Sequence, residues 1–307
     1  MSVAELGAEL SDRVGRHIPH DGYLLLGLDP VTGAGCFLAH ERAYSARARR
    51  QLAVEEPAGP WDDGRPVLAV GAGRYSAELH RTMAAEGFGA ALRIAARHGG
   101  VLWGELVLLR GRGFSPTEEA RAGGLSGALG VAVRRFVADR PLTAGRGGPA
   151  PAVVLVGADD TVRATPGTRA ALGVLVPDAR TDEDLFGPLW NLVHAARRGT
   201  GPALTRAPTA HGWMAVHAQP LDGGPPGEVA VTVGPASGGV LLPAVVAWYG
   251  ITPREGAVLR LVLDGLPARG IARRLELSQY TVNDHLRALY RKTGTHGRDE
   301  LAAALGG

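Results

Sequence analysis

Two reactive residue types are almost absent from this 307-residue chain, which contains one lysine and one cysteine. The lone Cys36 cannot form a disulfide within the chain and fits a reducing cytoplasm. The only lysine, Lys292, lies near the end of the sequence. Nothing before it can therefore supply the lysine of a phosphate-binding loop or of a Schiff base.

Long apolar stretches are also missing. A membrane-spanning helix needs about 20 consecutive apolar residues, and the longest apolar run, residues 238–251, is shorter and interrupted by Pro243. The first residues show no charged segment followed by an apolar core, which is the pattern of a signal peptide. We therefore expect a cytoplasmic protein that has no membrane partner.

Three motifs come close to known catalytic or phosphate-binding patterns without matching them. Residues 67–78 predict a strand followed by Gly71-x-Gly73-x-x-Ser76, but no acidic residue follows at the distance that a dinucleotide-binding fingerprint requires. In residues 152–160 a predicted strand is followed by an acidic pair, as in a receiver domain, but the lysine that a receiver domain usually has is missing from this chain. In the segment GGLSGALG (residues 123–130), Gly127 lies one position too early for the G-x-S-x-G pattern of a nucleophile elbow. With ten histidines in no paired ligand spacing, we expect no enzyme, no metal and no cofactor.

The C-terminal part predicts four short helices, over residues 251–265, 266–278, 277–292 and 295–307. The first begins with Thr252, Pro253 and Glu255, a capping box with proline at the first helical position, and Gly265 ends it. Only a few residues separate the second helix from the third, where Ser278 is the predicted cap. This spacing is typical of a helix-turn-helix.

The third of these helices is amphipathic. At about 100° per residue, Val282, Leu286, Leu289 and Tyr290 lie on one flank. The opposite flank mixes a phenol, an amide, a carboxylate and two guanidiniums, from Tyr280, Asn283, Asp284, Arg287 and Arg291. Such groups can bond base edges or phosphates. A mixed polar face on a surface helix is also often merely solvated, so this helix alone leaves both interpretations open.

The order of helices and their residues together resemble the LuxR-type DNA-binding domain over residues 251–307. The matching residues are Thr252-Pro253-Arg254-Glu255, Val258-Leu259, Gly265-Leu266, Ile271-Ala272, Leu275, Ser278, Thr281-Val282, His285-Leu286, Tyr290-Arg291-Lys292, Gly294, Arg298 and Glu300-Leu301. The sequence departs from the pattern at Gly256 and Gly270, each of which costs about 1 kcal/mol of helix propensity. Gly297 replaces the usual serine before Arg298.

The resemblance implies roles for individual residues. In that family the helix that begins near Ser278 enters the major groove, so Asn283, Asp284 and Arg287 would face the bases. The DNA backbone would be contacted by Arg269, Ser278, Tyr280, Thr281, His285, Arg291 and Lys292. The last helix dimerises the domain in this family, which implies a dimer surface made by Leu301, Ala302 and Leu305.

All of the net positive charge lies in this C-terminal part. Residues 240–307 contain nine Arg or Lys and six Asp or Glu, whereas the remaining residues contain 24 of each sign. This surplus is modest for a DNA-binding protein, so we expect a single copy to bind weakly and in a salt-sensitive manner. Dimerisation would double the phosphate contacts. Arg287 suits guanine, and Asp284 can accept a hydrogen bond from the amino group of cytosine.

The first part of the chain predicts a mixed fold. Two strands, a second hairpin and a long helix are predicted over residues 21–39, 90–111 and 114–140. Ser115, Pro116 and Glu118 begin the helix as another capping box with proline. This order of elements resembles a GAF domain, a small-molecule sensor or dimerisation module, over residues 1–143.

The middle of the chain predicts a smaller unit over residues 152–236. A strand, an Asp159-Asp160 turn, a helix and two paired strands are predicted at 153–156, 159–160, 166–173, 212–221 and 227–236, with 196–212 as a surface loop. This order resembles a PAS domain. Linkers are predicted at 144–151 and 237–250. The predicted fold class is therefore α+β and multidomain, with a GAF-like α/β sensor, a smaller PAS-like α/β unit and an all-α four-helix helix-turn-helix domain.

A sensor would hold its ligand in an apolar pocket lined by aromatic side chains. The candidates by position are Tyr23, Cys36, Trp61, Tyr75 and Trp103. The chain has only 16 aromatic residues, so the simpler alternative is that these five are core residues. A GAF-like domain can also bind nothing and serve as a dimerisation or partner surface.

These features predict a bacterial, actinobacterial-like transcription regulator whose GAF-like and PAS-like regions control dimeric DNA binding. Its expected partners are an inverted-repeat double-stranded DNA, a second copy of the chain, RNA polymerase and a small-molecule effector of unknown identity. The alternative is a dimerising scaffold that binds no ligand and whose helix-turn-helix engages protein. Salt dependence separates the two, because binding to DNA weakens steeply with salt.

Overall fold

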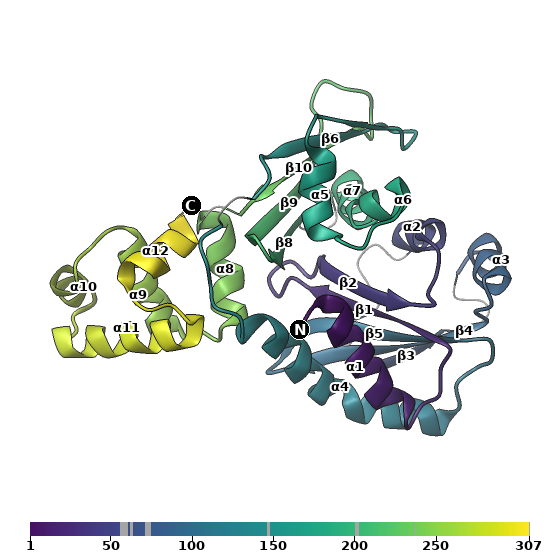
Figure 1. Cartoon of the computed structure of the whole chain (residues 1–307), viewed down its shortest axis with the longest axis horizontal. Coiled ribbons are helices and arrows are strands. Elements are labelled where there is room, and N and C mark those ends of the chain that lie inside the picture. The colour runs from purple at the N-terminus through teal and green to yellow at the C-terminus, as the bar shows by residue number, and fades with distance from the viewer. Residues whose placement is uncertain are drawn as a thin grey trace.

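The computed structural model describes residues 1–55, 61, 64–70, 75–145, 148–199, 203–236 and 238–306. It contains two antiparallel five-stranded sheets and a C-terminal group of helices. Figure 1 shows both sheets at one end of the molecule and the helical group at the other. The α+β multidomain class predicted from the sequence is thereby confirmed. We refer below to the first unit (residues 1–143), the second unit (152–236) and the helical unit (238–306).

The first unit contains one sheet and four helices. Its elements are α1 (Val3–Gly15), β1 (Gly22–Leu28), β2 (Gly35–Glu41), α2 (Ala46–Glu55), β3 (Val67–Val70), α3 (Ala77–Ala85), β4 (Ala90–His98), β5 (Val101–Arg110) and α4 (Pro116–Ala138). The strand order is β2-β1-β5-β4-β3. Both predicted hairpins are confirmed, and Gly99 and Gly100 take positive φ in the second turn. Gly71 and Gly73 of the near-miss nucleotide motif lie outside the described residues.

Helices cover both faces of this sheet. On one face α1 and α4 lie side by side (Figure 1), and the core there includes Leu10, Leu106 and Phe136. On the other face α2 and α3 cover a second core, which includes Leu79 and Leu109. The helices α1 and α2 were not predicted, although Ser2 and Glu5 form a complete capping box at the start of α1.

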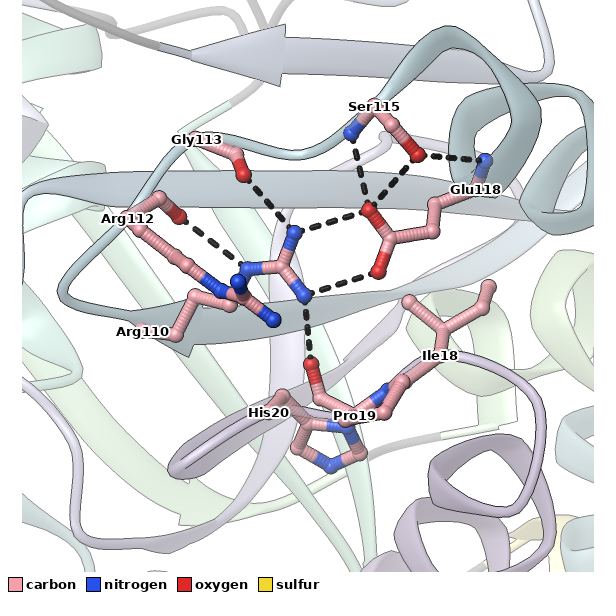
Figure 2. A network of polar contacts seen from close by, with 8 residues as sticks. All are labelled: Ile18, Pro19, His20, Arg110, Arg112, Gly113, Ser115 and Glu118. Carbon is pink, nitrogen blue, oxygen red and sulfur yellow. Dashed lines mark hydrogen bonds and ion pairs between the residues drawn. The ribbon is translucent and has the colours of Figure 1, made fainter.

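A buried arginine fixes the start of α4. Figure 2 shows the Arg110 guanidinium surrounded by acceptors: it donates to both carboxylate oxygens of Glu118 at 2.8 Å and to the carbonyl oxygens of Pro19, Arg112 and Gly113. The capping box predicted from Ser115 and Glu118 is formed at the same place. The Glu118 carboxylate therefore accepts hydrogen bonds both from Ser115 N at the start of α4 and from the buried guanidinium of Arg110.

The second unit contains the other sheet, in the strand order β7-β6-β10-β9-β8. Its elements are β6 (Ala152–Val156), β7 (Val162–Ala164), α5 (Thr168–Leu175), α6 (Asp182–Phe186), α7 (Leu189–Arg198), β8 (Leu204–Thr209), β9 (Gly212–Pro220) and β10 (Val229–Pro235). The predicted pairing of the last two strands is confirmed. The prediction of a surface loop over 196–212 is wrong, because β8 pairs with β9 along its whole length.

The helical unit begins with a helix where a linker was predicted. Its elements are α8 (Gly238–Trp248), α9 (Pro253–Leu263), α10 (Ala268–Leu275), α11 (Gln279–Thr293) and α12 (Arg298–Gly306). Although Pro243 lies inside α8, burial of Leu241, Val245 and Trp248 holds the helix together. Residues 238–250, which cover most of the predicted linker, thus form a packed element and not a flexible connection. Within the described part of the chain, no helix combines the length and apolarity needed to cross a membrane.

Candidate nucleic-acid interface

The helices α9, α10 and α11 pack around one apolar core. Its members include Val258, Leu259, Ile271, Val282, Leu286 and Leu289, all under 9% exposed. The predicted capping box of α9 is formed, with the Thr252 side chain accepting from Glu255 N and Glu255 accepting from Thr252 N. These apolar positions repeat at helical spacing, so the face that turns inward was readable from the sequence.

A tight turn separates α10 from α11. After α10 ends, Glu276 takes the left-handed conformation with φ of 55°, and Leu277 N donates to the Ala272 carbonyl at 2.9 Å. Ser278 then caps α11 by accepting from Thr281 N at 3.0 Å. The turn holds the two helices in a fixed relation, as a helix-turn-helix requires.

The outer face of α11 carries the polar residues predicted to read bases. The side chains of Asp284 and Arg287 are 48% and 72% exposed and form an ion pair at 2.9 Å, and Asn283 beside them is half-buried. Tyr280 at the helix start is 72% exposed. Figure 1 shows α11 along the free edge of the helical unit, away from both sheets. The structure therefore brings these polar residues together on one accessible surface.

The residues predicted to contact a DNA backbone differ in their surroundings. Arg269 and Arg291 are exposed, whereas Thr281 and His285 are half-buried. Ser278 is exposed, but its hydroxyl is engaged in capping. Exposed Arg273 and Arg274 on α10 were absent from the predicted set, although they share its helical face with Arg269.

Lys292, which was predicted to contact the DNA backbone, is engaged within the protein. Its ammonium group forms an ion pair with Glu255 at 2.6 Å and donates to the Gly250 carbonyl at 2.8 Å. Burial alone would raise the pKa of Glu255, but hydrogen bonds from Lys292 and Thr252 bring it below its ordinary value. The partners lie 37 residues apart, so nothing local in the sequence indicated this tie. Lys292 thus ties α11 to α9, and its contact with a DNA backbone stays a prediction.

Two of the three residues predicted to form a dimer surface on α12 are buried within the single chain. Leu301 and Leu305 are 0% and 1% exposed within a single chain, because α12 packs against α8 and α9. Ala302 is half-buried and Ala303 is exposed. The two leucines are core residues in this arrangement, since α8 covers them.

The five residues predicted to line a ligand pocket do not converge. Tyr23, Cys36 and Trp103 belong to the core under α1 and α4, whereas Trp61 and Tyr75 lie on the opposite face of the sheet. Burial raises the pKa of the Cys36 thiol well above its ordinary value. A surface hollow of about 370 Å³ between α1 and α4 is lined by none of the five.

Trp61 instead takes part in a buried polar cluster that the sequence did not reveal. Its indole N–H donates to Glu105 at 2.9 Å, and Glu105 pairs with Arg93 at 2.8 Å. Both charged side chains are under 9% exposed. The signal that the sequence offered was a single charged residue, Arg93 or Glu105, in the middle of each of two otherwise largely apolar strands.

Replacing Gly256 with Ala is expected to raise the free energy of unfolding of the helical unit by about 1 kcal/mol. An added Cβ would meet only Ile251 Cγ2, at 4.0 Å, so the helix gains propensity without a clash. Gly265→Ala is the matched control, because φ of +81° at that position strains an L residue. Denaturant midpoints should move in opposite directions for the two variants, and movement in the same direction would contradict the argument.

Comparison with solved structures finds only distant similarity. A domain of a two-component sensor histidine kinase from Sinorhizobium meliloti is 21% identical and covers 45% of this chain and 95% of its own, with a TM-score of 0.37. A GAF domain from Synechocystis is 22% identical over 43% of this chain and 93% of its own, with a TM-score of 0.31. These scores are too low to assign a fold, so the GAF-like and PAS-like resemblances stay predictions.

The similarity to curated proteins extends over about 50 residues of this chain. A protein named as an HTH-type transcriptional regulator of Mycobacterium bovis is 44% identical over 54 residues, which is 18% of this chain and 6% of that protein. The nitrate/nitrite response regulator protein NarL of Escherichia coli is 40% identical over 52 residues, 17% of this chain and 24% of its own length. The chain thus spans only a small part of these relatives. Residues 250–305 match the family model of the bacterial regulatory proteins of the luxR family, and they form a helix-turn-helix DNA-binding domain of that family.

Proposed function

We propose that this chain is a cytoplasmic transcription regulator that binds an inverted-repeat operator as a homodimer. Asn283, Asp284 and Arg287 read base edges, and Arg269 and Arg291 contact phosphates. The first and second units set the activity in response to a small molecule or a partner. Because the match to the luxR family model lies at residues 250–305, the helical unit carries the argument.

The observation that supports this function best is the exposed face of α11. A carboxylate and a guanidinium lie one helical turn apart and are paired only with each other on an otherwise accessible surface. A surface pair of this kind contributes at most about 0.5 kcal/mol, so little is lost when each group turns to a base. Guanidinium and carboxylate groups are the readers of guanine and of the cytosine amino group.

Selection of DNA from a random pool by the full-length protein tests the proposal. It is repeated with Asn283, Asp284 and Arg287 all replaced by Ala. An inverted-repeat motif that the wild type enriches and the triple variant does not would support sequence reading by this face. Equal enrichment by both proteins would refute it.

Salt dependence separates DNA binding from the alternative of a scaffold that engages protein. The logarithm of the DNA affinity should fall with the logarithm of salt concentration, with a slope of about 0.9 for each phosphate neutralised. A dimer with several arginine contacts should therefore lose much of its affinity over a fourfold increase in salt. A helix-turn-helix directed at a protein partner would show no such slope on DNA.

Replacing Arg287 with Ala is expected to cost about 1–3 kcal/mol of operator affinity and to relax preference at one base pair. Arg169→Ala is the matched control, because Arg169 is 71% exposed and also pairs with an aspartate, Asp182, but lies in the second unit. Operator titrations on single-base variants measure both effects. Uniform weakening across all sequences would instead place Arg287 on a phosphate.

A further inference from the structure

A buried ion pair joins the first and second units. Asp29, in the turn after β1, is 0% exposed, and its carboxylate pairs with the 5% exposed guanidinium of Arg206 in β8 at 2.7 Å. The same carboxylate oxygen accepts from Arg206 N at 3.1 Å. The other oxygen accepts from Val31 N and Thr32 N at 2.9 and 3.3 Å. Each carboxylate oxygen of Asp29 thus accepts two hydrogen bonds. A buried charge that lost these bonds would be costly, so this arrangement of Asp29 and Arg206 is favoured over others.

The arginine of this pair also reaches α8. Arg206 Nε donates to the carbonyl of Val240, in the first turn of α8. The guanidinium therefore joins three segments that are distant in sequence: the end of β1, the edge strand β8 and the helix that leads into the DNA-binding domain. Two further ion pairs join the first and second units, Arg49–Asp184 and Arg50–Asp160, but neither pair includes a residue of α8.

The other end of α8 is held by the first unit and by the helical unit. Trp248 packs its ring on Trp103 of β5 with centroids 4.7 Å apart, and its carbonyl accepts from Arg134 Nε of α4 at 3.2 Å. Just beyond the helix, Tyr249 donates to the Arg140 carbonyl at 3.0 Å. The helix α8 also packs on α12. The first unit, the second unit and the rest of the helical unit therefore all contact α8. Figure 1 shows α8 between the other helices of the helical unit and the two sheets.

We propose that the Asp29–Arg206 pair is an interdomain latch, which fixes α8 and thereby the DNA-binding domain against the first unit. A change in the relative placement of the first and second units separates the pair and withdraws the donor from Val240. The helix then loses its hold at one end, and the DNA-binding domain gains freedom relative to the rest of the chain. The consequence for DNA binding rests on the proposed function, whereas the latch itself does not.

Hydrogen exchange on the full-length Asp29→Asn variant tests the latch. An asparagine keeps the oxygen that accepts from Val31 and Thr32, but it turns an amide N–H₂ toward the Arg206 guanidinium, so the turn remains and the pair is lost. Backbone amides of α8 are expected to exchange about 10- to 100-fold faster. The amides of α9 and α11 should stay as protected as in the wild type.

Glu105→Gln is the matched control. It breaks a second buried arginine–carboxylate pair in the first unit, 8% and 7% exposed, whose recorded contacts do not include α8. This variant should loosen β4 and β5 and leave α8 exchange unchanged. If Asp29→Asn unfolds the chain, Arg206→Met replaces it, because Asp29 then keeps its three backbone N–H donors. The proposal would be overturned if a folded Asp29→Asn or Arg206→Met variant left the exchange of the α8 amides unchanged. It would also be overturned if Glu105→Gln accelerated that exchange as much as the latch variants do.

The latch also predicts a result in the operator assay. With the latch closed, two DNA-binding domains of a dimer are held at a fixed separation, so operator affinity should fall when one base pair is inserted between the half-sites. Asp29→Asn should bind the two spacings with more nearly equal affinity. If no operator exists, the proposed function fails while the exchange experiment still decides the latch.

Discussion

Replacing Arg110 with Met is expected to lower the free energy of unfolding of the first unit by about 3–5 kcal/mol. The guanidinium is buried, with 5% of the residue exposed, and serves one carboxylate and three carbonyl oxygens. A methionine fills a similar volume but donates nothing, so the Glu118 carboxylate is left without its partner (Figure 2). Urea unfolding, with hydrogen exchange read on β4 and β5, measures the loss.

Arg135→Met is the control for this change. Arg135 lies on α4, the helix that carries Glu118, and pairs with Asp139, but both side chains are more than 60% exposed. Exposed pairs of this spacing contribute about 0.3–0.5 kcal/mol. A similar loss of stability in both variants would show that the buried network has no special role.

The same network predicts a dependence on acid. Hydrogen bonding by Arg110, together with Ser115, lowers the pKa of Glu118 from its ordinary 4.5 to about 2. A carboxyl with a lowered pKa in the folded state stabilises the fold above its unfolded pKa, and this stabilisation is lost as pH falls through the folded pKa. The wild type should therefore lose stability from about pH 4.5 down to about 2, and Glu118→Gln should show less of this change. Identical pH profiles would contradict the assignment.

The helical unit was largely predictable because its signals are local. Capping boxes, apolar spacing at helical period and the Gly265 stop each depend on residues within a few positions of one another. Thr252 with Glu255 and Ser115 with Glu118 both form the contacts that their spacing predicts. The exposed face of α11 followed from the same reasoning, since a helix that buries Val282, Leu286 and Leu289 must expose the opposite side.

Elements that depend on distant partners were missed. The strand β8 has the sequence LTRAPT, which lacks clean alternation, and it exists because β9 pairs with it. The helix α8 contains Pro243, which indicates a break when only the local chain is considered. Its burial against the first unit, the second unit and the rest of the helical unit outweighs that penalty, and none of these neighbours could be read from the sequence.

The surroundings of several candidate site residues also depend on distant partners. Whether Leu301 is core or dimer surface depends on α8, and whether Lys292 is free depends on Glu255. The five pocket candidates were chosen by residue type, and the strands carry them to opposite faces of one sheet. The Asp29–Arg206 pair spans 177 residues, a separation at which no spacing rule connects two side chains.

Replacing Trp248 with Ala is expected to lower the free energy of unfolding by about 3–5 kcal/mol, the usual cost of truncating a large buried aromatic side chain. Trp248 is 0% exposed and lies in the core that joins the first unit to the helical unit. Its ring packs on Trp103, so the truncation leaves a cavity at the junction and not within a single unit. Thermal unfolding and exchange of the α8 amides measure the two consequences.

Trp248→Phe separates packing from polarity. The buried indole N–H of Trp248 has no hydrogen-bond partner among the described residues, so phenylalanine gives up no hydrogen bond and retains most of the aromatic contact. We expect this variant to lose less than half of what the alanine variant loses, and α8 should stay protected from exchange. Equal losses would show that ring packing on Trp103 does not hold the junction, and that the DNA-binding domain is docked through Tyr249, Arg134 and the Asp29–Arg206 pair.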